Sequence, residues 1–336
     1  MKATDFARYL SAFLSTYMPG VRNVSTNTIR SYRDTYRLLL VYFKNQLGVP
    51  VEKLSLATLT DKVVLGFLDW LQEKRCCSIS SRNQRLAALH AFFRYVQLEE
   101  PVLLASCQKV LAIPFKKHHK PAVRHLTPGA LRLILEQPDR NTLQGRRDLT
   151  ILCVLYDTGA RVQELVDLRV RDIRLDEPPV VSLTGKGRKT RHVPLMHHTA
   201  ALLARYMQEH GIGHEGTLDT PLFVNRQLGK ITRAGISYIL RKYSDSAREK
   251  SPIIPEPVTP HVLRHTKAMH LVQSGVALVY IRDLLGHVDI STTEIYARAD
   301  TEMKRKALEG AYPDMTSAEL PDWNQNQDLL SWLKRF

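Results

Sequence analysis

The chain contains little cysteine and no long hydrophobic run. Its four cysteines, Cys76, Cys77, Cys107 and Cys153, show no C-x-x-C spacing, and three of them fall within apolar patterns where a small buried thiol is expected. We therefore predict neither a disulfide framework nor a zinc site. No apolar stretch approaches the roughly 18 residues that a membrane span needs, and no basic segment followed by an apolar one is present. These absences exclude membrane insertion and secretion, and a reducing cytoplasm is the expected location.

Acidic residues are scarce compared with basic ones. The chain has 48 Lys and Arg against 33 Asp and Glu, a formal charge of +15, and its isoelectric point is near 9.7. The excess is concentrated in residues 1–126, which hold 19 Lys and Arg against 8 Asp and Glu, whereas residues 127–336 hold 29 against 25. Such a balance favours a polyanionic partner, DNA or RNA first of all, over a surface that is basic only for solubility. The amino-terminal part is expected to supply most of this attraction.

The length of 336 residues favours two domains, and residues 1–113 have the pattern of an all-helical bundle. A helix over 25–47 is predicted from its polar start and from the apolar residues near its end. Along it, four basic residues recur at steps that place them on one face: Arg30, Arg33, Arg37 and Lys44. That face could follow a phosphate backbone, or it could simply be solvated.

Two further helices complete the predicted bundle. One begins at Thr60, and the next begins near Ser80 or Ser81. On the second of these, Arg82 and Arg85 lie on a different side from the apolar residues. They are predicted to contact DNA.

Residues 114–126 are predicted to link the bundle to a second domain. The segment contains two prolines, four Lys or Arg and three histidines, and it lacks helical periodicity. His118 and His119 are adjacent, so in an extended chain they point apart and do not suggest a metal site. A basic strap across DNA is the expected use of this segment. Its contacts would be Lys116, Lys117 and Lys120.

The second domain, residues 127–312, is predicted to combine helices with a small antiparallel sheet. Its short strands are expected at 171–173, 180–183 and 192–195, and helices dominate after residue 198. A glycine-containing hairpin, 184–191, joins the last two strands and lacks the spacing of a phosphate-binding P-loop. Its basic residues are expected to meet DNA: Lys186, Arg188, Lys189 and Arg191.

Two threonine–proline pairs, Thr127–Pro128 and Thr259–Pro260, predict helix starts in this domain. The second pair places His261 in the first helical turn and Arg264 on the same face one turn later. Because exposed N–H groups at a helix start already favour an anion, a phosphate site is predicted here, against the alternative of two unrelated surface residues. His265 is expected to face the core or a backbone carbonyl rather than to bind a metal.

Two other features add residue types that phosphoryl transfer requires. A capping box at 291–294 predicts that Tyr296 lies near the start of a short helix. A tyrosine taken alone is more often a packing residue, but His287 lies nine positions before this one. Farther upstream, Arg161 follows a glycine-containing break, and Glu164 lies three residues later. That carboxylate could orient the guanidinium, or the two could form only a solvated ion pair.

Five short motifs occur in an order that resembles the tyrosine recombinase, or phage integrase, family: TGAR, the TGKG hairpin, PHVLRHT, LLGH and the tyrosine at 296. The resemblance covers roughly residues 127–300, with weaker support from the helical amino-terminal part. It implies a mainly α-helical fold with a small antiparallel β-sheet, made of an N-terminal helical core-binding (SAM-like) bundle and an α+β catalytic domain. It also implies double-stranded DNA as the substrate, and neither a metal nor another cofactor.

By this resemblance, six residues would carry the chemistry: Arg161, Lys186, His261, Arg264, His287 and Tyr296. Tyr296 would attack the phosphorus and form a 3′-phosphotyrosine while a 5′-hydroxyl leaves. Arg161 and Arg264 would hold the non-bridging oxygens as charge develops, and Glu164 would support Arg161.

The remaining three would manage protons and hydrogen bonds. His261 would accept the proton of Tyr296, and Lys186 would donate one to the leaving 5′-oxygen. His287 would hydrogen-bond the phosphate. A phenol with an ordinary pKa near 10 needs either such a base or nearby cations that favour phenolate, and the sequence offers both.

The resemblance further implies a site-specific recombinase that works on DNA at the nucleoid. Four protomers on two sites would close around the duplex as C-shaped clamps and exchange strands through a four-way junction. The tail, 313–336, ends in an amphipathic segment, 328–336, that is expected to dock on its own domain or on a neighbouring protomer. Integration and excision of a mobile element is the expected setting, with an accessory recombinase or directionality factor left open. The alternatives are type IB topoisomerase-like religation and a non-catalytic DNA-binding regulator.

Overall fold

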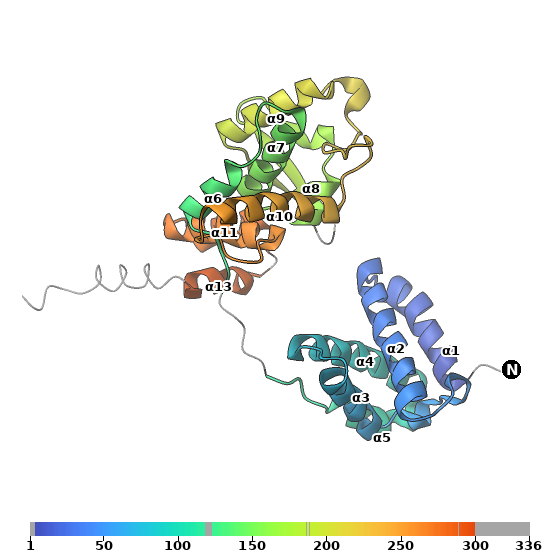
Figure 1. The fold of residues 1–336 in the computed structure, drawn as a ribbon. Helices are drawn as coiled ribbons and strands as arrows, with labels where there is room; N and C mark the ends of the chain where they lie inside the picture. Colours follow the sequence, from blue (N-terminus) through green and yellow to red (C-terminus); the bar gives the residue numbers. More distant parts are fainter. Residues whose placement is uncertain (1–3, 118–122, 186, 188, 288, 300–336) are drawn as a thin grey trace, which may run out of the picture. The chain divides into compact units, whose positions relative to one another are not determined.

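A computed structural model describes residues 4–117, 123–185, 187, 189–287 and 289–299. The chain separates into two compact units, Met1–Pro121 and Ala122–Phe336, each of which is described by itself (Figure 1). Several sequence expectations fall outside the described residues: His118, His119, Lys120, Lys186, Arg188 and the tail 313–336. Within the described ranges, no helix is long and apolar enough to cross a membrane.

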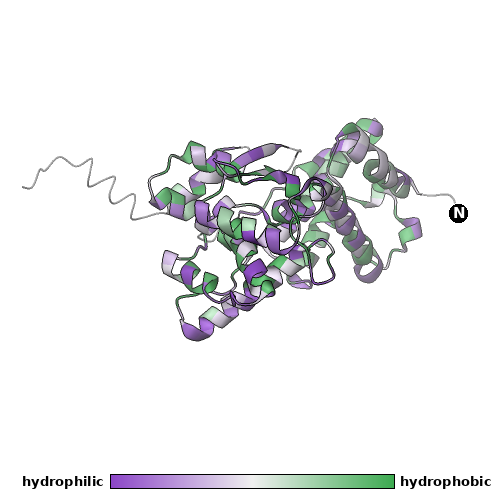
Figure 2. Ribbon diagram, turned by 90° about the horizontal axis from the view of Figure 1, so that it is seen from above, coloured by the Kyte–Doolittle hydropathy of each residue, from purple (hydrophilic) through white to green (hydrophobic). Residues whose placement is uncertain are grey.

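The first unit consists of helices only, within the described residues. Its helices are α1 (Asp5–Ala12), continued by a π-helical stretch (Phe13–Val21), α2 (Thr26–Gln46), α3 (Asp61–Glu73), α4 (Ile79–Glu99) and α5 (Leu104–Leu111), with single 3-10 turns at Val51–Lys53, Leu56–Thr58 and Pro101–Leu103. Hydrophilic and hydrophobic residues alternate around these helices (Figure 2), as amphipathic packing requires. Aromatic rings fill the core between them, with Phe92 contacting Phe6, Phe13 and Tyr36.

Local capping explains where these helices begin. Ser25 and Thr60 accept hydrogen bonds from backbone N–H groups at the starts of α2 and α3, which confirms both predicted starts. The start of α4 lies slightly earlier than predicted. Ser78, the first of the nearby serines, accepts from the Ser81 N–H and becomes the cap.

Two of the basic residues expected to contact DNA make hydrogen bonds within this unit. Arg82 is only 2% exposed and donates to Asn83 and to the Pro114 carbonyl, so it is removed from the candidate DNA contacts. Arg85 is half-buried and donates to Ser31 O and Thr35 Oγ1 of α2. In contrast, the α2 face keeps its four basic side chains exposed: Arg30, Arg33, Arg37 and Lys44.

The start of the expected linker lies against the first unit. Asn83 and Lys116 exchange two hydrogen bonds, from the Lys116 backbone N–H to Asn83 Oδ1 and from Asn83 Nδ2 to the Lys116 carbonyl. Lys116 also reaches Gln72 through its ammonium, and both Lys116 and Lys117 are exposed. The described start of the linker is therefore held against the first unit.

The second unit surrounds a small sheet with helices (Figure 1). Its helices are α6 (Pro128–Leu135), α7 (Leu143–Thr158), α8 (Val162–Asp167), α9 (His197–Glu209), α10 (Arg233–Lys250), α11 (Pro260–Gln273), α12 (Leu278–Leu285) and α13 (Ser291–Ala299), with 3-10 turns at Val170–Asp172 and Glu215–Thr217. Its strands are β1 (Ile173–Arg174), β2 (Val180–Thr184) and β3 (Thr190–Pro194). The mainly α-helical fold with a small antiparallel sheet is confirmed.

The strand register decides which way the hairpin side chains point. β2 pairs antiparallel with β1 and β3, so Val181 lies opposite Val193 and Leu183 lies opposite Arg191. Opposed residues point to the same face of a sheet, and Val181, Leu183 and Val193 are all buried. Arg191 therefore points into the protein, and the expectation that it contacts DNA is not met.

Helix starts in the second unit follow the predicted threonine caps with one exception. Thr127 and Thr259 accept from the N–H groups of Ala130 and Val262, which confirms the starts of α6 and α11. The capping box expected at 291–294 is shifted, because α13 begins at Ser291 itself. The carboxylate of Asp289 accepts the Ser291 N–H instead.

Candidate active site

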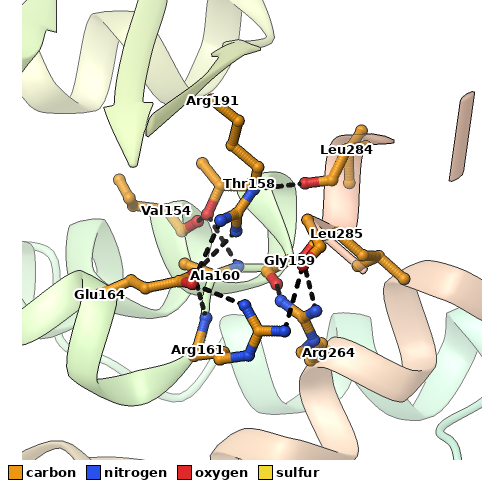
Figure 3. A network of polar contacts seen from close by, with 11 residues as sticks. Val154, Thr158, Gly159, Ala160, Arg161, Glu164, Arg191, Arg264, Leu284 and Leu285 are labelled. Carbon is orange, nitrogen blue, oxygen red and sulfur yellow. Dashed lines mark hydrogen bonds and ion pairs between the residues drawn. The ribbon is translucent and has the colours of Figure 1, made fainter. Parts of the chain in front are cut away.

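Three guanidinium groups from three different elements converge on the carboxyl end of α12. Arg191 of β3 donates Nε to Leu284 O at 2.8 Å, and Arg264 of α11 donates Nη2 to Leu285 O at 2.6 Å (Figure 3). Arg161, the residue before α8, donates Nη2 to Gly286 O at 3.3 Å. The last carbonyls of a helix have no partner within the helix and form the negative end of its dipole. This helix end therefore orients all three cations.

The buried carboxylate of Glu164 joins two of these arginines. It accepts from Arg161 Nη1 at 2.8 Å and from the Arg161 backbone N–H at 2.9 Å. It also accepts Nη1 and Nη2 of Arg191, at 3.1 and 2.7 Å. Burial would raise the pKa of Glu164, but the hydrogen bonds from Arg191 and Arg161 outweigh it, so the pKa is lowered and the carboxylate stays ionised.

Arg264 is almost fully enclosed in the unbound protein. It is 2% exposed, and its Nη1 donates to Gly159 O at 2.6 Å. Burial and the neighbouring Arg161 lower its pKa to about 10, so it remains cationic at neutral pH. Gly159 caps α7 with a positive φ of 56°, and a Cβ there would come within 2.9 Å of Leu285 Cδ2, so a glycine is needed at this position.

Two histidines flank the arginine cluster. His261 lies exposed in the first turn of α11, as predicted, and its ring centroid is 4.3 Å from that of His265. Partial burial and the charges of Arg264 and Arg161 lower the pKa of His261. His287 contacts Thr293 Oγ1 through Nδ1 at 2.9 Å, and burial together with the arginines lowers its pKa to about 4. Both rings are therefore neutral at neutral pH.

Tyr296 is buried, and its hydroxyl is bound to His265, a histidine to which the sequence analysis gave no catalytic role. Its side chain is 1% exposed, and Oη lies 2.8 Å from His265 Nδ1. His265 thus faces a buried side chain of the core, and the partner of its Nδ1 is a hydroxyl rather than a backbone carbonyl. Burial raises the pKa of Tyr296 although the charges of Arg264 and Arg161 oppose this. In the unbound protein, the cations thus do not make the phenol more acidic than usual.

An open groove of about 470 Å³ runs beside this cluster. It is lined by Arg161, Gly185, Lys189, Arg191, Arg282 and His287, among others. The lining is strongly basic, and the side chain of Arg161 is 40% exposed. A phosphate in the groove could therefore reach Arg161, whereas the buried Arg264 is not among the residues that line it.

The structure brings together most of the residues that sequence patterns predicted for the site. Arg161, Glu164, Arg264, His287 and Tyr296 come from segments far apart in the chain, yet direct contacts or shared neighbours connect them. Sequence reasoning missed the inward role of Arg191. One signal could have shown it, because strand residues two positions apart share a face and Arg191 alternates in phase with the apolar Val193.

The fold and this site define a class of protein: a DNA strand transferase that uses a tyrosine nucleophile. Comparison with known families agrees with this class. Residues 124–303 match the phage integrase family, and residues 8–100 match the phage integrase N-terminal SAM-like domain. The chain belongs to the phage integrase family of tyrosine recombinases, and it is a site-specific recombinase that acts on DNA.

Relatives match almost the whole chain. One is the "Putative integrase/recombinase y4rC" of Sinorhizobium fredii, 36% identical over 333 residues, which covers 99% of this chain and 98% of the relative. Another is the tyrosine recombinase XerC of Syntrophus aciditrophicus, 31% identical and covering 88% of this chain and 95% of that protein.

Solved structures share the fold at low sequence identity. The Tn1549 transposon integrase in complex with transposon right end DNA has a TM-score of 0.68 at 18% identity, covering 89% of this chain and 98% of that one. The XerH recombinase bound to its difH substrate in a post-cleavage complex has a TM-score of 0.67 at 21% identity, covering 89% and 84%.

Proposed function

We propose that this recombinase cleaves DNA by attack of the Tyr296 hydroxyl on a phosphodiester. The new bond joins Oη to phosphorus, and the bond from phosphorus to the 5′-oxygen breaks, which leaves a 3′-phosphotyrosine and a free 5′-hydroxyl. Rejoining reverses these steps with another 5′-hydroxyl, so the covalent link conserves the phosphodiester energy. The observation that carries the proposal is the placement of Tyr296 beside the arginine cluster: its ring lies 6.5 Å from that of His287, which follows the helix end that the three arginines bind.

The arginines would stabilise the charge that develops on the phosphate. Arg161 is partly exposed in the groove and would bind a non-bridging oxygen first. Arg264 would contact the other non-bridging oxygen once its buried guanidinium becomes accessible. Fixed guanidinium groups of this kind need no reorganisation during the reaction, and this is why preorganised charge lowers the barrier. His287 would donate a further hydrogen bond.

Proton transfer would involve two more residues of the site. We assign His261 as the acceptor of the Tyr296 proton, since its lowered pKa keeps the ring neutral before attack. Lys186, which lies outside the described residues, would donate a proton to the leaving 5′-oxygen. Its neighbour in the sequence, Gly185, lies in the groove against Glu164, and this supports the assignment.

Tyr296 must leave its buried position for this reaction to occur. The hydroxyl is bound to His265, and α13 packs its apolar face onto α11 and α12 through Met269, Ile281 and Leu285. DNA binding would therefore have to release α13 and expose both Tyr296 and Arg264. We propose that Tyr296 reaches the phosphate only after α13 has moved from this resting position.

A suicide duplex tests the cleavage chemistry. The substrate carries a nick close to the scissile phosphate, so that a short fragment diffuses away and the covalent complex cannot religate. The native protein should form a complex that survives denaturation, in the presence of a chelator, whereas Tyr296→Phe should form none and still bind the duplex. Tyr280→Phe is the control, because that tyrosine is 71% exposed on α12. Trapping by Tyr296→Phe would show that another residue is the nucleophile.

For strand exchange we propose a tetramer on two DNA sites that acts through a four-way junction. The residues 328–336 would dock between protomers. Deleting them should abolish exchange between two sites while single-site cleavage persists. Unchanged exchange would remove this role, and relaxation of supercoils without exchange products would favour topoisomerase-like religation.

The biological setting we propose is integration and excision of a mobile element. The resemblance to "integrase/recombinase" relatives supports it, although relatives named XerC also match. Amplification across the joined ends of an excised circle, in cells that carry the gene and its flanks, should yield a product. Dependence of that product on a second protein would identify an accessory recombinase or directionality factor.

A further inference from the structure

Arg191 occupies a position unlike that of its neighbours on the hairpin. Lys189 and Thr190 are exposed, whereas the side chain of Arg191 is 13% exposed. Its guanidinium donates in three directions at once, with Nη1 and Nη2 to the two oxygens of Glu164 and Nε to Leu284 O. Only the planar fork of an arginine can satisfy these three acceptors together.

Two glycines allow backbone to approach this ion pair closely. A Cβ on Gly185 would lie 2.9 Å from Glu164 Oε1, and a Cβ on Gly286 would lie 3.0 to 3.2 Å from three atoms of the Arg191 side chain. Gly185 precedes Lys186 on the hairpin, and Gly286 precedes His287 after α12. The pair Glu164–Arg191 thus touches the backbone beside two of the proposed catalytic residues.

We propose that Arg191 is a positioning residue for cleavage, and not a DNA contact. Through Glu164 it fixes the guanidinium of Arg161, and through Leu284 O it fixes the end of α12 from which His287 extends. It also anchors the hairpin that carries Lys186. This inference rests on the proposed function, because the residues that it positions are those assigned to cleavage.

The test measures single-turnover cleavage of the suicide duplex at saturating protein. Arg191→Met keeps the volume of the side chain and should slow cleavage by about 10- to 100-fold, the usual effect of removing such a supporting partner. Arg191→Lys retains the charge but cannot reach three acceptors, so it should not restore the rate. The affinity for the duplex and its dependence on salt should stay unchanged, since no phosphate contact is lost.

Arg146→Met is the matched control. Arg146 forms an ion pair with Glu209 at 2.7 Å, with both side chains about as buried as Arg191, in the same unit but outside the site. Its loss should lower the thermal unfolding temperature without changing the cleavage rate. Equal slowing by both variants would reduce Arg191 to a structural role.

A double variant guards against failure to fold. Arg191→Met alone leaves the Glu164 carboxylate with fewer partners, whereas Glu164→Gln combined with Arg191→Met removes both charges. If the two residues act as one unit, the double variant should cleave as slowly as either single variant. If the rate reductions of the two single variants multiply in the double variant, the residues act independently and the proposal is overturned.

The pH profile supplies a second measurement. The charged groups facing Glu164 are Arg161 beside α8, Arg191 on β3 and Arg264 on α11. Without Arg191, the pKa of Glu164 should rise, so in Arg191→Met protonation of Glu164 should add to that of His261 and move the acid limb of the rate profile to higher pH. If the acid limb of Arg191→Met does not move, and DNA binding by this variant becomes weaker and less dependent on salt, Arg191 is a DNA contact. Absence of trapping by the native protein, in contrast, would overturn the proposed function itself.

Discussion

The hydroxyl of Tyr296 is the group whose surroundings matter most at the scale of single residues. It is buried, and among the described residues its hydrogen-bond partner is the neutral ring of His265. Burial and the positive surroundings of His265 lower the pKa of its imidazole to about 4. The pair therefore stabilises the resting position of α13 with a bond that has no net charge.

His265→Leu should weaken this resting position. The Tyr296 hydroxyl would stay buried without an acceptor, which costs about 1–3 kcal/mol, and α13 should open more often. Hydrogen exchange over residues 291–297 should become about tenfold faster. In a Tyr296→Phe background the same substitution should have little effect, because no hydroxyl remains to be satisfied. Equal acceleration in both backgrounds would contradict the role of this bond.

Acid should destabilise the second unit in a defined window. His265 and His287 have a pKa of about 4 in the folded protein, against about 6.5 in an unfolded chain. Between these values the unfolded chain binds more protons, so the free energy of unfolding should fall as pH drops from about 6.5 towards 4. Thermal unfolding at pH 7 and 5 measures this loss, and His287→Asn should make it smaller. If the stability of His287→Asn falls with pH as steeply as that of the native protein, His287 does not contribute to the loss.

At the scale of elements, the carboxyl end of α12 organises the site. Leu284, Leu285 and Gly286 each present a carbonyl to a different arginine, and α12 ends in the left-handed conformation at Gly286, with φ of 63°. An unsatisfied helix terminus is thus stabilised by the same cations that would bind phosphate. The end of one short helix sets the spacing of these three arginines.

Gly286→Ala should damage this arrangement more than Gly187→Ala. Both glycines have a positive φ, which costs an alanine about 1–2 kcal/mol. A Cβ at Gly187 meets nothing within 4 Å, whereas one at Gly286 meets Arg191 at 3.0 Å. Thermal unfolding should show a larger loss for Gly286→Ala, and single-turnover cleavage should slow only in that variant. Equal losses of stability in the two variants would mean that the side chain of Arg191 can move away from the new Cβ at no measurable cost.

For the whole molecule, the excess of positive charge and the proposed active site lie in different parts of the chain. Most of the net positive charge lies in residues 1–126, and the α2 face keeps its arginines exposed. The second unit uses several of its arginines internally, as ion pairs and as donors to carbonyls. We therefore expect the first unit to contribute strongly to DNA affinity and the second to catalysis.

Arg37→Gln should lower the affinity for duplex DNA at every sequence. Loss of one phosphate contact should reduce the slope of log affinity against log salt by about 1. Lys53→Gln is the control, since Lys53 is equally exposed but belongs to the turn Val51–Lys53 and not to the α2 face. The affinity of each variant for the duplex, measured at two or more salt concentrations, gives these slopes. An unchanged slope for Arg37→Gln would show that the α2 face is only solvated.

The sequence by itself determined the helix starts, the order of motifs and most of the site. Caps at Thr60, Thr127 and Thr259 act within three or four residues, so a local pattern is sufficient to predict them. The same holds for His261 and Arg264, which one helical turn places on one face.

Only the tertiary structure decided which partners these residues find. The pairs Glu164–Arg191 and His265–Tyr296 join positions 27 and 31 residues apart, and Arg82 is buried against a distant carbonyl. Such contacts depend on strand register and on helix packing, which no local pattern encodes. The charged groups of this chain are therefore recognisable from their types and spacing. Whether each one faces DNA or the interior follows from the fold, because burial of a charge is stabilised only where the folded chain supplies its partner.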